Sequence, residues 1–289
     1  MSPRFLMIDA GHYGVHYQIN PWMQPNAWST DPAARMLALK ASEDLYAALL
    51  AAGATVERNP GVAGLPDLVF PANAAIVLDG KVLLARFRYP ERQGEEAVFR
   101  AAFQDLKARG LVDEVVELPD DVLQEGAGDA IWDRDRGVFW VGHGQRSTDT
   151  SIAAIETVFG QAVVSLELAS DRFYHLDTCF CPLRGGKLLY YPPAFTPAAL
   201  AAIHAHVRPQ DRIVASDEDA AAFCVNAVNI GRHIIMANPP AGLRARLESL
   251  GFQVTGIDLA PFILSGGGAY CMTLRLDRRS KAEMVCAAE

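Results

Sequence analysis

The chain has 289 residues, with 26 Lys and Arg against 34 Asp and Glu, which gives a formal net charge of −8. Hydrophobic residues make up 51% and charged residues 21%, so the composition supports a core and excludes intrinsic disorder. The acidic balance, without a Lys/Arg cluster, argues against nucleic acid as a partner. No apolar run reaches the ~18 residues of a membrane span, and the first residues do not resemble a signal peptide. We therefore expect a cytoplasmic protein without a membrane partner.

The five cysteines are few and odd in number, which argues against a secreted disulfide framework. Cys179 and Cys181 form a C-x-C pair, whereas Cys224, Cys271 and Cys286 stand alone. No C-x-x-C motif occurs, which excludes a zinc ribbon or a thioredoxin motif. At least one of the cysteines is therefore a candidate for chemistry.

Predicted elements follow one another in a repeated order of strand, strand, helix and strand. In chain order they are a helix over 31–52, a strand from 55, a hairpin of 74–78 and 82–87, a helix over 95–109, a strand over 114–117, strands over 130–132 and 138–141, a helix over 149–159, a strand over 163–168, strands over 176–180 and 187–190, a helix over 197–206, a strand over 212–215, strands over 225–230 and 233–236, a helix over 240–250, a strand over 253–257 and an apolar stretch over 270–276. The hairpins exclude a purely parallel doubly wound sheet, and a radial array of such units is the natural closed arrangement.

A glycine cluster marks the C-terminal part of the chain, where Gly266, Gly267 and Gly268 precede Cys271 and an apolar stretch. Three glycines let a ligand or another backbone approach closely. A cysteine at this junction can face a cavity, where positive neighbours would lower the pKa of its thiol. The structural alternative is a loop of glycines and a buried cysteine.

The segment His175-Leu-Asp-Thr-Cys-Phe-Cys181 is the second candidate. On a strand, His175, Asp177 and Cys179 would share a face. A histidine beside a carboxylate is suited to general acid or base chemistry, and a structural histidine is the alternative. A metal site from these residues has weak support, because no distant fourth ligand is evident.

Further carboxylates occur where a cation site is conceivable. Glu125 and Asp129 are separated by small residues, and Asp67 lies among apolar residues, where an unpaired charge is costly. Carboxylates pair with a planar guanidinium through two hydrogen bonds, which fixes its plane. Solvated turns are the alternative at these sites. Arg88 and Arg146 follow predicted strands and are candidates for a substrate carboxylate or for surface ion pairs.

Taken in order, these motifs resemble the guanidino-group-modifying superfamily, the penteins. The likeness covers nearly the whole chain: it begins at His12-Tyr-Gly-Val-His-Tyr-Gln-Ile-Asn-Pro-Trp-Met23 and ends at the Gly-Gly-Gly-x-x-Cys segment. The resemblance implies an α/β fold, a five-bladed propeller of ββαβ units, which agrees with the repeated order of predicted elements. It also implies a single domain over residues 1–289.

The resemblance implies roles for individual residues. Cys271 would be the nucleophile and His175 the general acid and base, while Asp67 and Glu125 would hold the guanidinium. Asp177 would bind the guanidinium or orient the histidine. Because this chain has one more residue between Glu125 and Asp129 than many relatives, Asp129 is the alternative to Glu125. Asn20 and Asn73 would lie near the substrate.

The implied activity is hydrolysis of a C–N bond in a small guanidino or ureido compound such as arginine or methylated arginine. The thiol would form a covalent thiouronium intermediate, and neither a metal nor an organic cofactor would be needed. Two alternatives are an amidinotransferase, in which an amine replaces water, and a non-enzymatic binding protein of the same fold. A homo-oligomer is possible.

Overall fold

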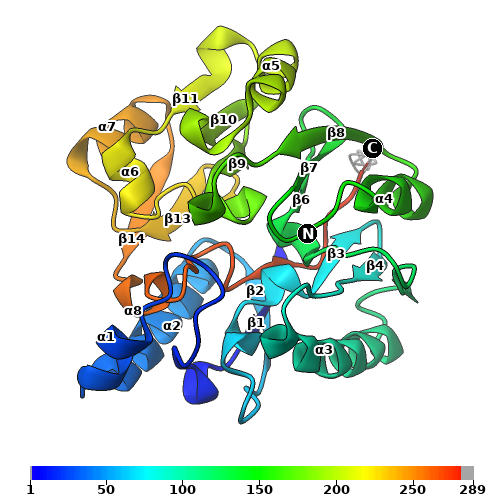
Figure 1. Cartoon of the computed structure of the whole chain (residues 1–289). Coiled ribbons are helices and arrows are strands. Elements are labelled where there is room, and N and C mark those ends of the chain that lie inside the picture. The colour runs from blue at the N-terminus through cyan, green and yellow to red at the C-terminus, as the bar shows by residue number, and fades with distance from the viewer. Residues whose placement is uncertain (1, 281–289) are drawn as a thin grey trace, which may run out of the picture.

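Five three-stranded sheets make up the protein, and they surround a common centre (Figure 1). The structure is a computed structural model that describes residues 2–280, so Cys286 lies outside the described part. The sheets are β3 (Ala75–Leu78), β4 (Lys81–Leu84) and β5 (Glu114–Val116); β6 (Ala130–Asp133), β7 (Val138–His143) and β8 (Ala162–Glu167); β9 (Phe180–Leu183), β10 (Lys187–Tyr190) and β11 (Arg212–Val214); β12 (Val228–Ile230), β13 (His233–Ala237) and β14 (Gln253–Ile257); and β15 (Leu274–Arg275), β1 (Arg4–Ile8) and β2 (Thr55–Asn59).

Every sheet has the same internal topology. The middle strand is antiparallel to the first strand and parallel to the third. A parallel pair needs a crossover, and a helix supplies it each time. These helices are α2 (Ala34–Ala51), α3 (Pro90–Ala108), α4 (Ser151–Phe159), α5 (Pro197–His206) and α7 (Ala241–Ser249). The remaining helices are α1 (Pro25–Thr30), α6 (Asp217–Ala221) and α8 (Ala260–Ile263). The predicted α/β fold of ββαβ units is confirmed.

One sheet joins the two ends of the described chain. Strand β15 pairs with β1, with Phe5 opposite Arg275 and Leu6 opposite Leu274. The last strand of the ring is therefore held by the first, which closes the circle of sheets.

Local sequence explains why the elements begin and end where they do. Asp79 and Gly80 have φ values of 53° and 77°, which is the left-handed pair that a two-residue hairpin turn requires. Helix α3 starts at Pro90, five residues before the predicted start, because proline is favoured in the first helical turn. In α2 the buried residues Ala38, Ala41, Leu45 and Leu49 recur at helical spacing, and this stripe packs into the core.

Two predicted strands differ from the structure. Residues 176–178 form a 3₁₀ turn, and the strand begins only at Phe180. The apolar stretch over 270–276 contains only the two-residue strand β15, and a turn over 269–272 precedes it. In both places apolar, buried residues lie in tight turns, which alternation and apolar runs do not distinguish from strands.

The loop before the first strand of each sheet brings one polar side chain to the centre of the ring. These residues are Asn73 before β3, Asp129 before β6, Asp177 before β9, Asn226 before β12 and Cys271 before β15. All five are buried. Residues that are up to 198 positions apart in the chain are thus collected at one place by the repeat of the fold. Within residues 2–280, no helix is long and apolar enough to cross a membrane.

We expect the closing sheet to be sensitive to loss of packing in β1. Leu6 is fully buried, and its replacement by Ala should lower the free energy of unfolding by about 2–5 kcal/mol through the cavity it leaves. Urea unfolding followed by circular dichroism measures this. Leu37→Ala is the matched control, because Leu37 is 42% exposed and its loss should cost about 0.5 kcal/mol or less. Equal losses in the two variants would contradict the proposed importance of this sheet.

Candidate active site

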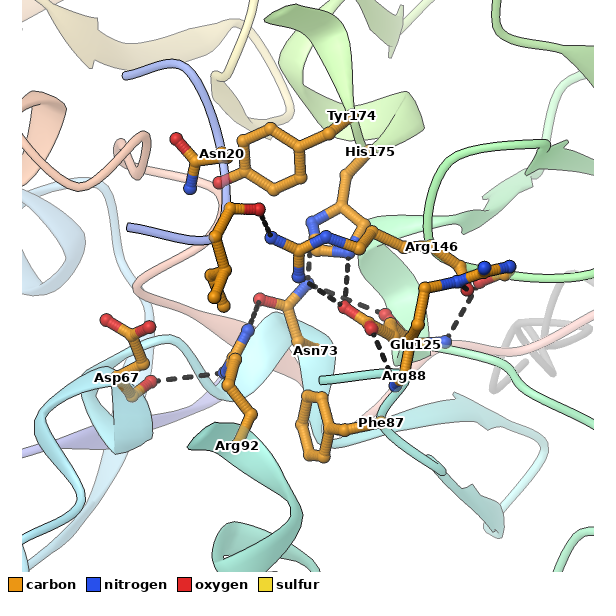
Figure 2. Close-up of polar contacts among 12 residues, drawn as sticks. Asn20, Asp67, Asn73, Phe87, Arg88, Arg92, Glu125, Arg146, Tyr174 and His175 are labelled. Atoms are coloured by element: carbon orange, nitrogen blue, oxygen red, sulfur yellow. Dashed lines mark hydrogen bonds and ion pairs between the residues drawn. The ribbon is translucent and has the colours of Figure 1, made fainter. Parts of the chain in front are cut away.

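A small cavity of about 10 Å³ lies at the loops that precede the sheets, with room for about one water molecule. Six of the residues that line it carry an amide, a carboxylate, a guanidinium or a thiol: Asn20, Asp67, Asn73, Arg92, Arg146 and Cys271. Five of these were predicted site residues, and Arg92 was not. Figure 2 shows how several of these side chains lie relative to one another.

Cys271 is held by a turn that only glycine permits. Gly266 has a φ of 81°, and a side chain on Gly267 would come within 2.1 Å of the Phe70 ring. Asn226 fixes the thiol from the other side: its Oδ1 accepts the backbone N–H of Cys271 at 3.2 Å, and its Nδ2 donates to Sγ at 3.0 Å. Burial raises the pKa of the Cys271 thiol well above its ordinary value, and the negative charge of Asp177 adds to this effect.

Asp177 lies directly against the thiol. The Cys271 Sγ–H donates to Asp177 Oδ2 at 3.2 Å, while Oδ1 has no hydrogen-bond partner among the described residues. Burial raises the pKa of Asp177 to about 7. The prediction that His175, Asp177 and Cys179 share the face of a strand is wrong, because the 3₁₀ turn sends them in different directions. Cys179 is buried in an apolar cluster, and its Sγ donates to the Leu176 carbonyl at 3.5 Å.

Glu125 holds His175. Its Oε2 lies 2.7 Å from His175 Nε2 and 3.1 Å from Arg146 Nη1, and its Oε1 accepts the backbone N–H of Arg88 at 3.1 Å (Figure 2). Burial alone would raise the pKa of this carboxyl, but the charge of Arg146 and the contact with His175 hold the pKa of Glu125 below its usual range. Glu125 is therefore an anion whose oxygens are already occupied.

Asp129 binds the backbone of Leu176, the residue that follows the same histidine. Its Oδ1 accepts the N–H of Leu176 at 2.9 Å, and its Oδ2 accepts the Ser147 hydroxyl at 2.6 Å and lies 4.0 Å from His175 Nε2. Burial raises the pKa of Asp129 to about 6. Of the predicted site residues, Glu125, Asp129, His175 and Asp177 do not line this small cavity.

Asp67 contributes a second carboxylate with a vacant oxygen. Tyr17 donates its hydroxyl to Asp67 Oδ2 at 2.8 Å, whereas Oδ1 is buried without a partner among residues 2–280. Burial raises the pKa of Asp67, and the charges of Arg92 and Arg146 oppose this change.

A buried ion pair that the sequence interpretation missed organises this wall. Arg92 donates to both oxygens of Glu95, at 2.8 and 2.7 Å. Its Nη1 also donates to Asn73 Oδ1 at 2.9 Å (Figure 2). That bond turns the Asn73 amide nitrogen toward His175 Nδ1, 3.4 Å away. Arg92 and Glu95 are three residues apart in α3 and lie on its buried face together with Phe99. This helical spacing was the sequence signal from which the pair could have been predicted.

The other arginine of the cavity is clamped between aromatic rings. The guanidinium of Arg146 lies 4.6 Å from the ring centres of both Tyr89 and Tyr174, and the side chain is only 2% exposed. Arg88 is exposed and does not line the cavity; its Nε donates to the Arg146 carbonyl at 3.0 Å.

Asn20 closes the cavity near the glycine turn. Its Nδ2 donates to the Ser265 carbonyl at 3.0 Å, and its Oδ1 accepts the N–H of Trp22. Among residues 2–280, no three His, Cys, Asp or Glu side chains are grouped so that they could hold a metal ion. Asn226 and Tyr17 were missed because single polar residues in otherwise apolar or surface-like segments carry no local pattern.

Comparison with known proteins places this geometry in a family. A family model described as N,N dimethylarginine dimethylhydrolase, eukaryotic, matches residues 18–278. The bifunctional arginine dihydrolase/ornithine cyclodeaminase ArgZ of Synechocystis is 42% identical over 94% of this chain and 37% of its own length. The N(G),N(G)-dimethylarginine dimethylaminohydrolase of Mycobacterium tuberculosis is 34% identical over 94% of this chain and 85% of its own length.

Solved structures of the N-terminal domain of ArgZ are also similar to this chain. The product-bound form has a TM-score of 0.92 and 41% identity, over 98% of this chain and all of that one. A cysteine-to-serine variant bound to substrate and an asparagine-to-serine variant covalently bound to a reaction intermediate each have a TM-score of 0.91, with 41% and 40% identity, over 97% of this chain and all of theirs. The chain spans little more than a third of full-length ArgZ. Because the family model spans most of its length and the mycobacterial relative matches it nearly end to end, the chain belongs to the N,N-dimethylarginine dimethylhydrolase family.

Proposed function

We propose that this protein is a cysteine-dependent hydrolase that cleaves a C–N bond in the guanidino group of arginine or of an arginine derivative. One observation carries the proposal: Asp67 and Asp177, both buried near Cys271, each have a carboxylate oxygen without a partner among the described residues. Buried, unpaired carboxylates are unfavourable, and a planar cation with several N–H donors would satisfy both. Such a cation would lie beside the sulfur.

The remaining polar groups suit the amino-acid end of the substrate. Arg92 and Arg146 supply positive charge at the cavity wall, and Asn20 lies next to the glycine turn. We propose that the two arginines attract the α-carboxylate of the substrate and that Asn20 and Asn73 line its path. Arg92 takes the place that the sequence interpretation gave to Arg88. Because the cavity is so small, its wall must move to admit an amino acid.

The proposed reaction begins with activation of Cys271 by its own substrate. Burial and Asp177 keep the thiol protonated in the empty site, and a bound guanidinium would favour the thiolate. Attack of the thiolate on the guanidinium carbon gives a tetrahedral adduct. His175 then protonates the departing amine, which breaks the C–N bond and leaves a thiouronium on Cys271. Water, after giving a proton to His175, attacks this carbon and releases a ureido product and the thiol.

Glu125 and Asp129 have separate tasks in this proposal. Glu125 orients the imidazole of His175 through the 2.7 Å contact, and Asp129 holds the backbone that carries the histidine. Both are positioning residues, and Asp67 and Asp177 are the pair that holds the guanidinium.

Arginine is the substrate that we propose to test first. The relative with 42% identity is named an arginine dihydrolase, whereas the relative with 34% identity is named a dimethylarginine dimethylaminohydrolase. A dihydrolase would hydrolyse the ureido product a second time at the same thiol. We further propose that residues 1–289 form one domain. The cytoplasmic location and a homo-oligomeric state stay predictions.

The first prediction is that only Cys271 among the cysteines is essential. Cys271→Ser should lower kcat by about a thousandfold or more, because the hydroxyl loses its proton far less readily than the thiol. Cys179→Ser is the matched control and should keep most of the activity, since its Sγ lies in an apolar cluster. Product formation measured by mass spectrometry decides, and an essential Cys179 with a dispensable Cys271 would refute the scheme.

A second prediction concerns the intermediate and the substrate. Arginine, N,N-dimethylarginine, citrulline and agmatine are each incubated with the protein, and products are identified by mass spectrometry. With arginine, acid quench should trap protein heavier by arginine minus ammonia, and peptide mapping should place this mass on Cys271. Citrulline as the end product indicates one hydrolysis and ornithine indicates two. An amidinotransferase would instead release ornithine and leave only the amidino group on Cys271, to be taken up by added glycine; that smaller adduct would favour the transferase, and no turnover of any compound would refute the proposal.

The third prediction follows from the raised pKa of Asp177, about 7 in the folded protein against ~3.9 in an unfolded chain. The folded state binds the proton more tightly, so the stabilisation from this group is complete below about pH 4 and is lost as the pH rises through 7. Asp177→Asn removes the buried charge. It should abolish activity and raise the unfolding temperature above wild type by a few degrees at pH 8 and less at pH 5.

Thermal unfolding at pH 5, 6, 7 and 8 measures this difference. Asp121→Asn is the control, because Asp121 is exposed and its replacement should leave the pH dependence unchanged. A D177N variant with the pH dependence of wild type would show that Asp177 does not carry a buried charge.

A further inference from the structure

A second, much larger cavity of about 720 Å³ adjoins the candidate site. Asp177 lines it, and the same residue accepts the thiol proton of Cys271, which lines the small cavity. The contact between Asp177 and Cys271 therefore connects the two cavities. A volume of this size is typical of a binding site for a small organic molecule.

Each acidic side chain of the large cavity accepts at least one hydrogen bond, although Asp177 Oδ1 has no partner among residues 2–280. Asp133 accepts from Arg136 Nη1 at 2.6 Å and from Trp140 Nε1 at 3.0 Å. Asp277 accepts from Arg275 at 3.0 and 3.2 Å and from the backbone of Arg4. Asp135 Oδ2 accepts the backbone N–H of Gly186, and Asp177 Oδ2 accepts from Cys271.

Four of the five arginines that line the same cavity are not paired in this way. Arg134, Arg184, Arg278 and Arg279 line it, and none of them forms an ion pair with a carboxylate of residues 2–280. The chain as a whole has a net charge of −8, so this group of guanidinium groups is a local excess of positive charge.

Arg278 gives the strongest evidence for an anion-binding site in this cavity. Its Nη1 donates only to the Trp132 carbonyl, at 3.3 Å, and burial lowers the pKa of its guanidinium. Trp132 lines the cavity too, and its Nε1–H is buried without a partner among the described residues. Arg184 reaches over Gly231 at the edge of the cavity, where a side chain on that glycine would meet Nη1 at 3.5 Å.

We propose that the large cavity binds a small organic anion with two or more carboxylate or phosphate groups. Arg278 pairs with one anionic group in the interior, and Arg184, with Arg134 and Arg279, pairs with another at the edge. Guanidinium forks bind both kinds of group through charge-assisted hydrogen bonds. The site is distinct from the cavity that Cys271 lines, and Asp177 lies between the large cavity and the thiol.

Calorimetric titration of the full chain at constant ionic strength tests the proposal, with citrate, inorganic pyrophosphate and acetate as probes. Citrate or pyrophosphate should bind with saturation and acetate should not; which of the two binds tells whether carboxylates or phosphates are preferred. Arg184→Gln and Arg278→Gln should each weaken binding by about tenfold or more. Arg35→Gln, on α2 and outside this cavity, is the matched control and should bind as wild type.

Arg184 is exposed, so its variant should fold even if Arg278→Gln does not; circular dichroism checks both. Saturable binding that is weakened in Arg184→Gln and unchanged in Arg35→Gln supports the site. Absence of saturable binding by both polyanions would overturn the proposal. Binding that is equally strong in Arg184→Gln would also overturn it, because the anion would then lie elsewhere.

Discussion

Excess buried negative charge is the constraint on which this protein depends. Five carboxylates at the centre of the ring, Asp67, Glu95, Glu125, Asp129 and Asp177, are at most 3% exposed, and two buried arginines lie among them. Arg92 neutralises Glu95, and Arg146 neutralises Glu125. Burial disfavours the charged forms of the other three carboxylates and of Glu95, and raises the pKa values of all four above the ordinary range. The fold therefore holds an arrangement that is unfavourable until a cation arrives, and the proposed function uses that imbalance for binding and for thiol activation.

The repeat of the fold explains how so many polar groups reach one point. Each ββαβ unit begins with a loop at the centre, and turns such as residues 126–128 and 176–178 orient the backbone there. Gly126, with a φ of 66°, would place a side chain 2.4 Å from the Ala72 carbonyl, so neighbouring loops touch through their backbones. This close approach leaves little freedom for the side chains that the loops carry, which is the condition for a preorganised site.

Much of this architecture follows from local patterns in the sequence. The hairpin at Asp79-Gly80, the stripe of α2 and the glycine run before Cys271 each have a direct physical cause, and together they predicted the ββαβ order and the position of the thiol. The turn at residues 176–178 was not predictable from alternation, because its buried residues look like those of a strand. The distinction between Glu125 as a support of His175 and as a guanidinium ligand required distances between segments that lie 50 residues apart.

Arg92 illustrates a different limit. A charged residue near the start of a helix is usually solvated, and only its position on the buried stripe with Glu95 and Phe99 indicated otherwise. Its function depends on Asn73 and Asp67, whose positions come from another loop. Local sequence therefore predicted which elements form, whereas the partners of each side chain were set by the closure of the ring.

The vacant oxygens of Asp67 and Asp177 have a consequence for work with this protein in solution. Guanidinium chloride, a common denaturant, supplies the same planar cation that these carboxylates lack. At low concentration the ion would occupy the native site and favour the folded state by mass action, and only at higher concentration would its general solvation of the unfolded chain dominate. A linear extrapolation to zero denaturant would then give a wrong free energy of unfolding. Urea is uncharged, so it would denature the protein without also binding to these carboxylates as a cation.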